Sequence, residues 1–204
     1  MTYKTAKIDL HYIAVKEFAM KTKESGKTAS ASKKEYEKIP MSQVKKLPYK
    51  TLNRLINKAK NYLKADESWK KLCDKYETDV NIIDFIPTMF GNLEVSAKTD
   101  HGIIILNYRL LCDGNFTEDY SYLIHEYTHW FQQCFGEKST KSSDDGSYLD
   151  NIYEQEGFSN QIEYIANNQG ESKAEEYVDD LLDHHEIDNK NKRDELESIF
   201  LEKV

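Results

Sequence analysis

The sequence has little cysteine and no long apolar segment. Its three cysteines are odd in number and lack C-x-x-C spacing, which argues against a disulfide framework and favours a reducing compartment. No apolar run reaches the roughly eighteen residues that a membrane span needs. The stretch from Ile8 to Met20 is interrupted by charged residues, so it does not resemble the apolar core of a signal peptide. We therefore expect a cytoplasmic protein without a membrane span or signal peptide.

The sequence also lacks internal repeats and the glycine-rich motifs of nucleotide-binding proteins. Neither a P-loop nor a G-x-G-x-x-G segment is present. The 204 residues suit one domain, with room for an appendage. Hydrophobic residues make up 39% and aromatic residues 12%, which is enough to build a core in an otherwise polar chain.

Charge is distributed unevenly along the chain, whose formal net charge is -8. Residues 1–75 contain 19 Lys and Arg against 8 Asp and Glu, whereas the remainder contains 9 basic and 28 acidic residues. This asymmetry suggests two functional regions. The basic part could contact nucleic acid or another anionic partner, although a solvated lysine-rich helix surface is the simpler interpretation.

One short motif indicates chemistry. Residues 125–129 read His-Glu-Tyr-Thr-His, which is the H-E-x-x-H signature of zinc hydrolases. Residues four apart lie on the same face of a helix, so His125 and His129 can reach one ion. Zinc makes a water molecule acidic, and Glu126 is placed to accept its proton. The motif predicts a zinc-dependent hydrolase with these three residues in its site. The competing interpretation is a helix that merely contains two histidines.

The surroundings of the motif favour an amphipathic helix. Thr117, followed by two acidic residues, is typical of a helix start, and Gly136 is typical of a helix end. Apolar residues recur between them at helical spacing. They are Tyr120, Leu123, Ile124, Tyr127, Phe131 and Cys134.

A zinc hydrolase usually needs a third protein ligand. The extended metzincin pattern would have Gly at position 132 and His at position 135, where this sequence has Gln132 and Phe135. That branch is excluded. The histidines outside the motif do not have helical spacing to it. The adjacent His184 and His185 are expected near a helix C-terminus, where a cation is favoured, and are not assigned a second metal site.

The segment 153–160 resembles the second zinc motif of the gluzincins, the thermolysin-like clan. In that clan a Glu is followed by a small residue and, further on, by Ser-Asp. Here Glu156 precedes Gly157, and Ser159-Asn160 occupy the Ser-Asp place. The resemblance covers roughly residues 80–168 and implies that Glu156 is the third zinc ligand.

The same resemblance implies that Asn160 orients a ligating histidine through a hydrogen bond. Asn in place of Asp departs from the family pattern. Glu154 is the alternative third ligand, on a different helical face, and Glu163 is a more distant one. Zincins also often place a Tyr, His or Arg near the developing oxyanion. Three tyrosines are candidates for that role by position alone. They are Tyr148, Tyr153 and Tyr164.

The order of expected elements predicts an α+β, zincin-like fold. Helices are expected from Pro48 to Ala65 and from Asp66 to Tyr76. Strands are expected over Val80–Ile86, Leu93–Ala97 and Ile103–Tyr108, followed by the motif helix. A helix from Leu149 to Asn168 contains the third-ligand candidates, and acidic helices follow over Glu171–His185 and Asn189–Leu201. We assign residues 1–78 to a basic helical N-terminal region and residues 79–204 to the zincin-like core.

Two functional hypotheses follow. In the first, the chain is a zinc metallopeptidase in which Glu126 is the general base. Zincins pair the substrate main chain with a strand at the sheet edge, and the expected strand Ile103–Tyr108 implies a peptide or protein substrate. In the second, the chain is a catalytically silent zincin-fold binding or assembly protein that acts through its basic N-terminal region. Retention of Glu126 favours the first.

Overall fold

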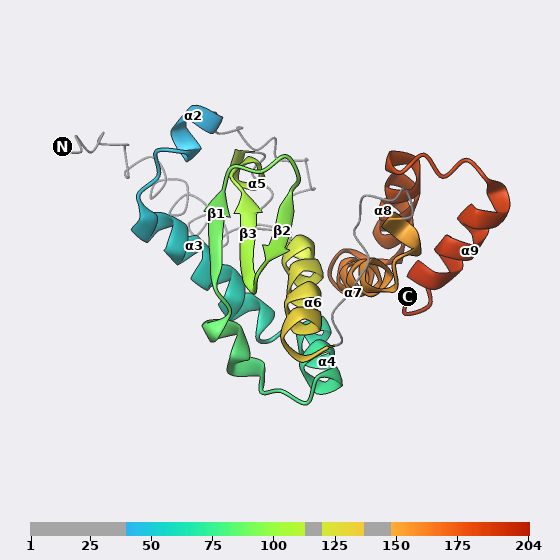
Figure 1. The fold of residues 1–204 in the computed structure, drawn as a ribbon, viewed down its shortest axis with the longest axis horizontal. Helices are drawn as coiled ribbons and strands as arrows, with labels where there is room; N and C mark the ends of the chain where they lie inside the picture. Colours follow the sequence, from blue (N-terminus) through green and yellow to red (C-terminus); the bar gives the residue numbers. More distant parts are fainter. Residues whose placement is uncertain (1–39, 113–119, 137–147) are drawn as a thin grey trace, which may run out of the picture.

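The computed structural model describes residues 40–112, 120–136 and 148–204. Over these residues the protein is α+β and mostly helical, with one small sheet (Figure 1). Residues 1–39 of the predicted basic region lie outside the described residues, as does the predicted helix start at Thr117. None of the helices in the described ranges has both the length and the apolar character required to cross a bilayer.

Three helices open the described chain: α2 (Met41–Val44), α3 (Tyr49–Leu63) and α4 (Glu67–Lys75). Helix α3 follows Pro48, as the sequence predicts. Helix α4 is capped by the carboxylate of Asp66, which accepts a hydrogen bond from the backbone N–H of Ser68. The two predicted helices before the sheet are therefore confirmed.

The predicted strand over Val80–Ile86 is wrong. The structure has a 3₁₀ helix there, η1 (Val80–Phe85). Asp79 caps it by accepting the N–H of Asn81, and only Ile83 is fully buried along its length. The local cap outweighs the β-branched composition that suggested a strand.

The sheet has three strands, β1 (Thr88–Gly91), β2 (Ala97–Asp100) and β3 (Ile103–Asn107), in the order β1-β3-β2. Strand β1 pairs with β3 in parallel, and β2 pairs with it antiparallel. The strand predicted over Ile103–Tyr108 is thus found, but it lies at the centre of the sheet and not at the edge. Strand β2 is the edge strand beside α6 (Figure 1).

The strand predicted over Leu93–Ala97 begins only at Ala97 in the structure, at the residue where it was expected to end. The cause is Asn107, whose side-chain amide donates to the carbonyls of Leu93 (2.8 Å) and Val95 (2.7 Å). These bonds satisfy the carbonyl groups without a ladder, so the segment runs irregularly into β2.

Helix α5 (Arg109–Cys112) follows the sheet, and the motif lies on α6 (Ser121–Phe135), which ends at Gly136 as predicted. The predicted apolar stripe is buried from Tyr120 through Phe131. Cys134 is the exception, because it is exposed near the end of the helix and is not a core residue.

The C-terminal part consists of η3 (Tyr148–Asp150), α7 (Ile152–Gln169), α8 (Glu171–His184) and α9 (Lys190–Phe200). Helices α8 and α9 match the predicted ones closely, whereas α7 begins at Ile152, after η3, and not at the predicted Leu149. The side chain of Asn151 caps α7, and Gly170, with φ of 101°, separates α7 from α8. Asn189 caps α9.

Two hydrophobic cores lie on either side of α6 and α7. The first joins α2, α3, α4, the sheet and α6, so residues before and after position 78 share it. Trp69 is fully buried in this core, and its ring lies 5.2 Å from that of Tyr127 and 5.6 Å from that of Phe131. The second core joins α7, α8 and α9. Helices α6 and α7 pack on each other where the cores meet, which places the motif at their junction (Figure 1).

Candidate metal centre

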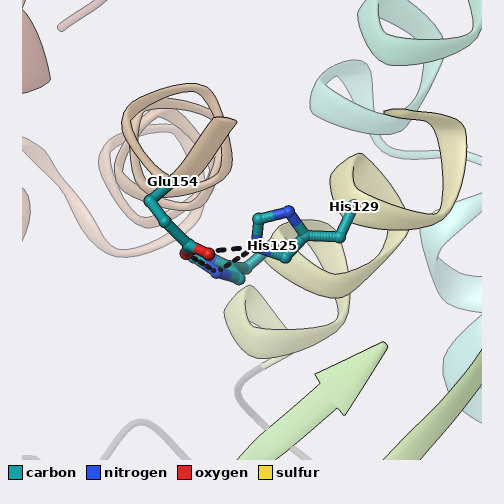
Figure 2. A group of neighbouring side chains, drawn as sticks. All are labelled: His125, His129 and Glu154. Carbon is teal, nitrogen blue, oxygen red and sulfur yellow. Dashed lines mark hydrogen bonds and ion pairs between the residues drawn. The ribbon is translucent and has the colours of Figure 1, made fainter. Parts of the chain in front are cut away.

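The two motif histidines face a common point. They lie one turn apart on α6, and their Nε2 atoms are 2.9 Å apart. The rings are nearly perpendicular, at 80° and 4.6 Å between centroids. Both rings are largely buried, with side-chain exposures of 9% for His125 and 15% for His129. The spacing of the motif therefore produces the paired imidazoles that the sequence predicts (Figure 2).

The third group at this point is Glu154, from the first turn of α7. Its Oε2 lies 3.2 Å from Nε2 of His129 and 3.5 Å from Nε2 of His125. These three residues form a group close enough to hold one metal ion (Figure 2). The Asn151 cap fixes where α7 begins and thereby directs Glu154 across to α6.

Glu156, the residue that the sequence favoured as third ligand, lies elsewhere. Its carboxylate accepts hydrogen bonds from Lys75 (2.7 Å), Tyr76 (3.3 Å) and Gln132 (3.0 Å). Two residues along an α-helix correspond to a rotation of about 200°, so Glu154 and Glu156 cannot face the same point. The geometry selects the alternative, Glu154, as the third member of the group. Glu163 is also directed elsewhere, to an ion pair with Lys71.

The three donor atoms fit a small divalent ion. Two imidazole nitrogens and one carboxylate oxygen form a known zinc ligand set, and tetrahedral bonds of that set separate donors by about 3.3 Å. The three separations here, 2.9, 3.2 and 3.5 Å, bracket that value. Two unprotonated Nε2 atoms at this distance would repel each other, so the site needs either an ion or a proton between them.

Electrostatic interactions among these three side chains favour a proton on His129. Burial alone would raise the pKa of Glu154, but hydrogen bonds from His125, His129 and Tyr148 hold it well below its usual range. Burial would lower the pKa of His129, but the hydrogen bond and charge of Glu154 outweigh this and raise it to about 9. In this arrangement His129 carries a positive charge near neutral pH.

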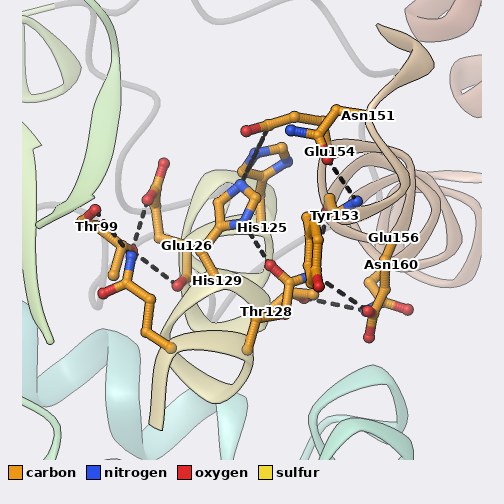
Figure 3. Close-up of polar contacts among 12 residues, drawn as sticks. Thr99, His125, Glu126, Thr128, His129, Asn151, Tyr153, Glu154, Glu156 and Asn160 are labelled. Atoms are coloured by element: carbon orange, nitrogen blue, oxygen red, sulfur yellow. Dashed lines mark hydrogen bonds and ion pairs between the residues drawn. The ribbon is translucent and has the colours of Figure 1, made fainter. Parts of the chain in front are cut away.

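Glu126 lies on the opposite side of the histidines from Glu154, next to the edge strand (Figure 3). Its side chain is buried, and its Oε2 accepts a hydrogen bond of 2.7 Å from the hydroxyl of Thr99 on β2. The same hydroxyl lies 2.9 Å from the backbone carbonyl of Glu126. Thr99 therefore orients the carboxylate that the motif assigns as a base, a role that sequence inspection missed.

His129 is held from behind by Gln132, which lies three residues further along α6. Nδ1 of His129 is 2.8 Å from Oε1 of Gln132. Asn160, the residue predicted to orient a histidine, does not reach one. Its amide donates to the hydroxyl of Thr128 (3.0 Å) and accepts from Lys203 (2.7 Å). Glu156 and Asn160 are four residues apart on α7 and lie on the same helix face. Because that face is directed away from the metal group, neither residue reaches a histidine.

A cleft of about 1500 Å³ surrounds the group. One wall is the edge strand β2 with its flanking residues, the floor is α6, and the other wall comes from η3, α7 and α8. Of the three tyrosines proposed near an oxyanion, Tyr148 lies beside the metal group and donates a hydrogen bond to Glu154. Tyr153 also lines the cleft, whereas Tyr164 is buried in the first core.

His184 and His185 line the same cleft. The ring of His185 stacks on Tyr148, with centroids 5.1 Å apart. Burial and the neighbouring His184 lower the pKa of His185, and Glu154 offsets part of this shift. This lowered pKa opposes the positive charge that the sequence favours at this helix end.

Comparison with models of protein families, with curated proteins and with solved structures finds no match.

Proposed function

We propose that this protein is a zinc-dependent metallopeptidase whose ligands are His125, His129 and Glu154. The observation that supports this most directly is the convergence of three donor atoms at zinc-like separations inside a large cleft. Two of the donors come from an H-E-x-x-H helix, whose intervening Glu126 is also present and buried beside them. The assignment keeps the zincin interpretation of the sequence and replaces Glu156 by Glu154.

Zinc is the favoured metal because of the donor set. Two neutral imidazoles and a carboxylate are the set of catalytic zinc sites that leave a fourth position open. When bound, zinc would act as a Lewis acid that makes a water molecule nucleophilic near neutral pH and polarises a carbonyl group. Ca²⁺ and Mg²⁺ fit less well, since both prefer oxygen ligands.

The residues around the group have separate tasks in this proposal. Glu126 accepts the proton of the attacking water and later delivers it to the leaving amine. Thr99 holds that carboxylate by its hydroxyl hydrogen bond. Tyr148 and Gln132 hold Glu154 and His129 in place.

The edge strand supports an extended peptide as substrate. The N–H of Asn107 donates to the carbonyl of Ser96, so alternate residues Ser96, Lys98 and Asp100 direct their backbone groups toward β3. The backbone groups of Ala97 and Thr99 then point to the open side of β2. The carbonyl of Thr99 accepts from Gln133, and Ala97 offers an N–H and a C=O to a peptide lying along the cleft.

The first test is metal content. Elemental analysis of purified wild-type protein, Glu154→Gln and Glu156→Gln is expected to find about one zinc per wild-type chain and loss in Glu154→Gln. Incubation with a peptide mixture, followed by mass spectrometry, is expected to show cleavage that Glu126→Gln reduces by at least about 100-fold while zinc is retained. Absence of zinc after reconstitution of the wild type would overturn the proposal. The binding-protein hypothesis, with the basic N-terminal region as the active part, would then take its place.

A further inference from the structure

Gln132 connects the metal group to a carboxylate that is not part of it. Its Oε1 faces Nδ1 of His129, and its Nε2 donates to the backbone carbonyl of Tyr153 (3.1 Å) and to Oε2 of Glu156 (3.0 Å). In Figure 3 the side chain of Glu156 lies apart from that of Glu154, although both residues belong to α7. The side chain of Gln132 is buried between the two helices, so water does not replace these partners freely.

The partners of Gln132 allow one orientation of its amide. A carbonyl and a carboxylate oxygen accept hydrogen bonds and cannot donate them, so the NH₂ group must face α7. The amide oxygen is then left facing His129, and an oxygen can only accept. Nδ1 of His129 must therefore bear a hydrogen, so Nε2, which faces Glu154 and His125, is the nitrogen whose proton a metal ion would replace. That is the tautomer that a ligating histidine needs.

Glu156 is itself fixed by the neighbouring helix. Its Oε1 accepts from Nζ of Lys75 (2.7 Å) and from the hydroxyl of Tyr76 (3.3 Å), both at the end of α4. With Oε1 taken by α4, Oε2 remains for Gln132. The ring of Tyr76 stacks on Phe131 at 4.8 Å between centroids, which packs this end of α4 against α6.

We infer that Glu156 is a positioning residue that acts through Gln132 to fix the metal-binding tautomer of His129. This inference rests on the proposed metal site, and it assigns Glu156 a role different from that of a ligand. Outer partners of this kind change metal affinity by about 10–100-fold when removed.

The conservative replacement Glu156→Gln is expected to weaken zinc binding more than Glu156→Ala. In Glu156→Gln, the new amide oxygen stays on Lys75 and Tyr76, so its NH₂ group faces Gln132. Gln132 then receives opposite demands, because the amide at position 156 favours its oxygen on the α7 side while the carbonyl of Tyr153 still favours its NH₂ there, so the tautomer of His129 is no longer fixed. In Glu156→Ala, the carbonyl of Tyr153 still orients Gln132.

Zinc affinity, measured by competition with a chelator, tests this order. We expect Glu156→Gln to bind zinc about 10–100-fold more weakly than wild type, and Glu156→Ala to be affected less. The double variant Gln132→Glu/Glu156→Gln is expected to recover part of the affinity, because a carboxylate at position 132 accepts from Nδ1 and from the amide at position 156, although it loses the bond to the carbonyl of Tyr153. The Co²⁺ absorption spectrum is expected to stay that of wild type in Glu156→Ala, since the ligands are unchanged.

Glu163 provides the matched control. It lies on α7 two turns after Glu156, is buried, and forms an ion pair with Lys71 of α4, as Glu156 does with Lys75. Glu163→Gln therefore removes the charge of an equivalent interhelical pair without touching Gln132. We expect its zinc affinity to equal that of wild type, even where its melting temperature falls.

The outcomes separate the inference from the proposed function. If wild type binds zinc and Glu156→Gln binds it equally well, the positioning role is wrong and the metal site stands. A Co²⁺ spectrum altered in Glu156→Ala, with Glu154→Gln still binding, would identify Glu156 as a ligand and also overturn the inference. Failure of the wild type to bind either metal would overturn the proposed function itself.

Discussion

Gly157 lies directly against the imidazole ring of His125. A Cβ atom at position 157 would stand 2.9 Å from Cε1, 3.1 Å from Nδ1 and 3.2 Å from Nε2 of that ring. Phe158 contacts the same ring edge-on, at 4.5 Å between centroids. Helix α7 can thus approach α6 closely enough to bring Glu154 to the histidines only because residue 157 has no side chain.

Gly157→Ala is expected to weaken zinc binding by about 10-fold or more, because the cheapest relief of the contact is rotation of the His125 ring away from the metal position. Ala is the better helix former, so the metal-free variant is expected to lose little stability. Chelator competition and thermal unfolding of the metal-free protein measure the two effects.

Gly170 is the contrasting glycine at the other end of α7. A Cβ atom there would meet nothing within 4 Å, but φ is 101°, where side chains are strained. Gly170→Ala is expected to cost about 1–3 kcal/mol of stability and to leave zinc affinity unchanged. Equal zinc affinity in Gly157→Ala and wild type would show that the metal group does not depend on the close approach of α7 to α6.

Thr99→Val is expected to lower kcat for peptide cleavage by about 10-fold with little change in zinc affinity. The substitution keeps the shape of the side chain and removes the hydroxyl that orients Glu126. Thr88→Val, on the opposite edge strand β1, is the control, because its hydroxyl bonds the carbonyl of Ile86 away from the cleft. A kcat that stays at the wild-type value in Thr99→Val would show that the Thr99 hydroxyl is not needed to orient Glu126.

Tyr148→Phe is expected to weaken zinc binding by about 10-fold while preserving the fold. The hydroxyl donates to Glu154, whereas the ring, which stacks on His185, is retained. Isothermal titration of zinc into both proteins measures the change. Unaltered affinity combined with a lower kcat would instead assign the hydroxyl to the substrate.

The stability of the metal-free protein is expected to fall as pH rises from about 6 to about 10. The pKa of His129 is raised from 6.5 to about 9, so its contribution is complete below the unfolded-state pKa and is lost as pH rises through the folded-state value. The lowered pKa of Glu154 adds stability that is lost as pH falls below its ordinary value of 4.5. Urea unfolding across this range measures the slope.

His129→Gln is the control for the pH dependence, because it removes the titrating group and keeps a hydrogen-bonding side chain. We expect the decline between about pH 6 and pH 10 to flatten in this variant. A decline as steep as that of the metal-free wild type would assign the dependence to other groups.

Much of the secondary structure follows from local signals. Asp66 and Asn189 cap helices where the sequence predicts helix starts, whereas Asn151 caps α7 a little after its predicted start at Leu149. Gly136 and Gly170 stand where helices end. The sheet was predicted less well. Asp79 and Asn107 use their side chains to satisfy backbone groups, which converted one predicted strand to a 3₁₀ helix and moved another.

The sequence by itself determined the pairing of His125 and His129 and the presence of Glu126 between them, because a spacing of four on one helix is a local property of the backbone. It could not choose between Glu154 and Glu156. Helix α7 is buried continuously from Gly157 to Ile165, so its pattern does not reveal which side meets α6. Only tertiary packing decided this, because the close contact of Gly157 with His125 sets the rotation of α7, and that rotation brings Glu154 to the histidines and Glu156 to Gln132.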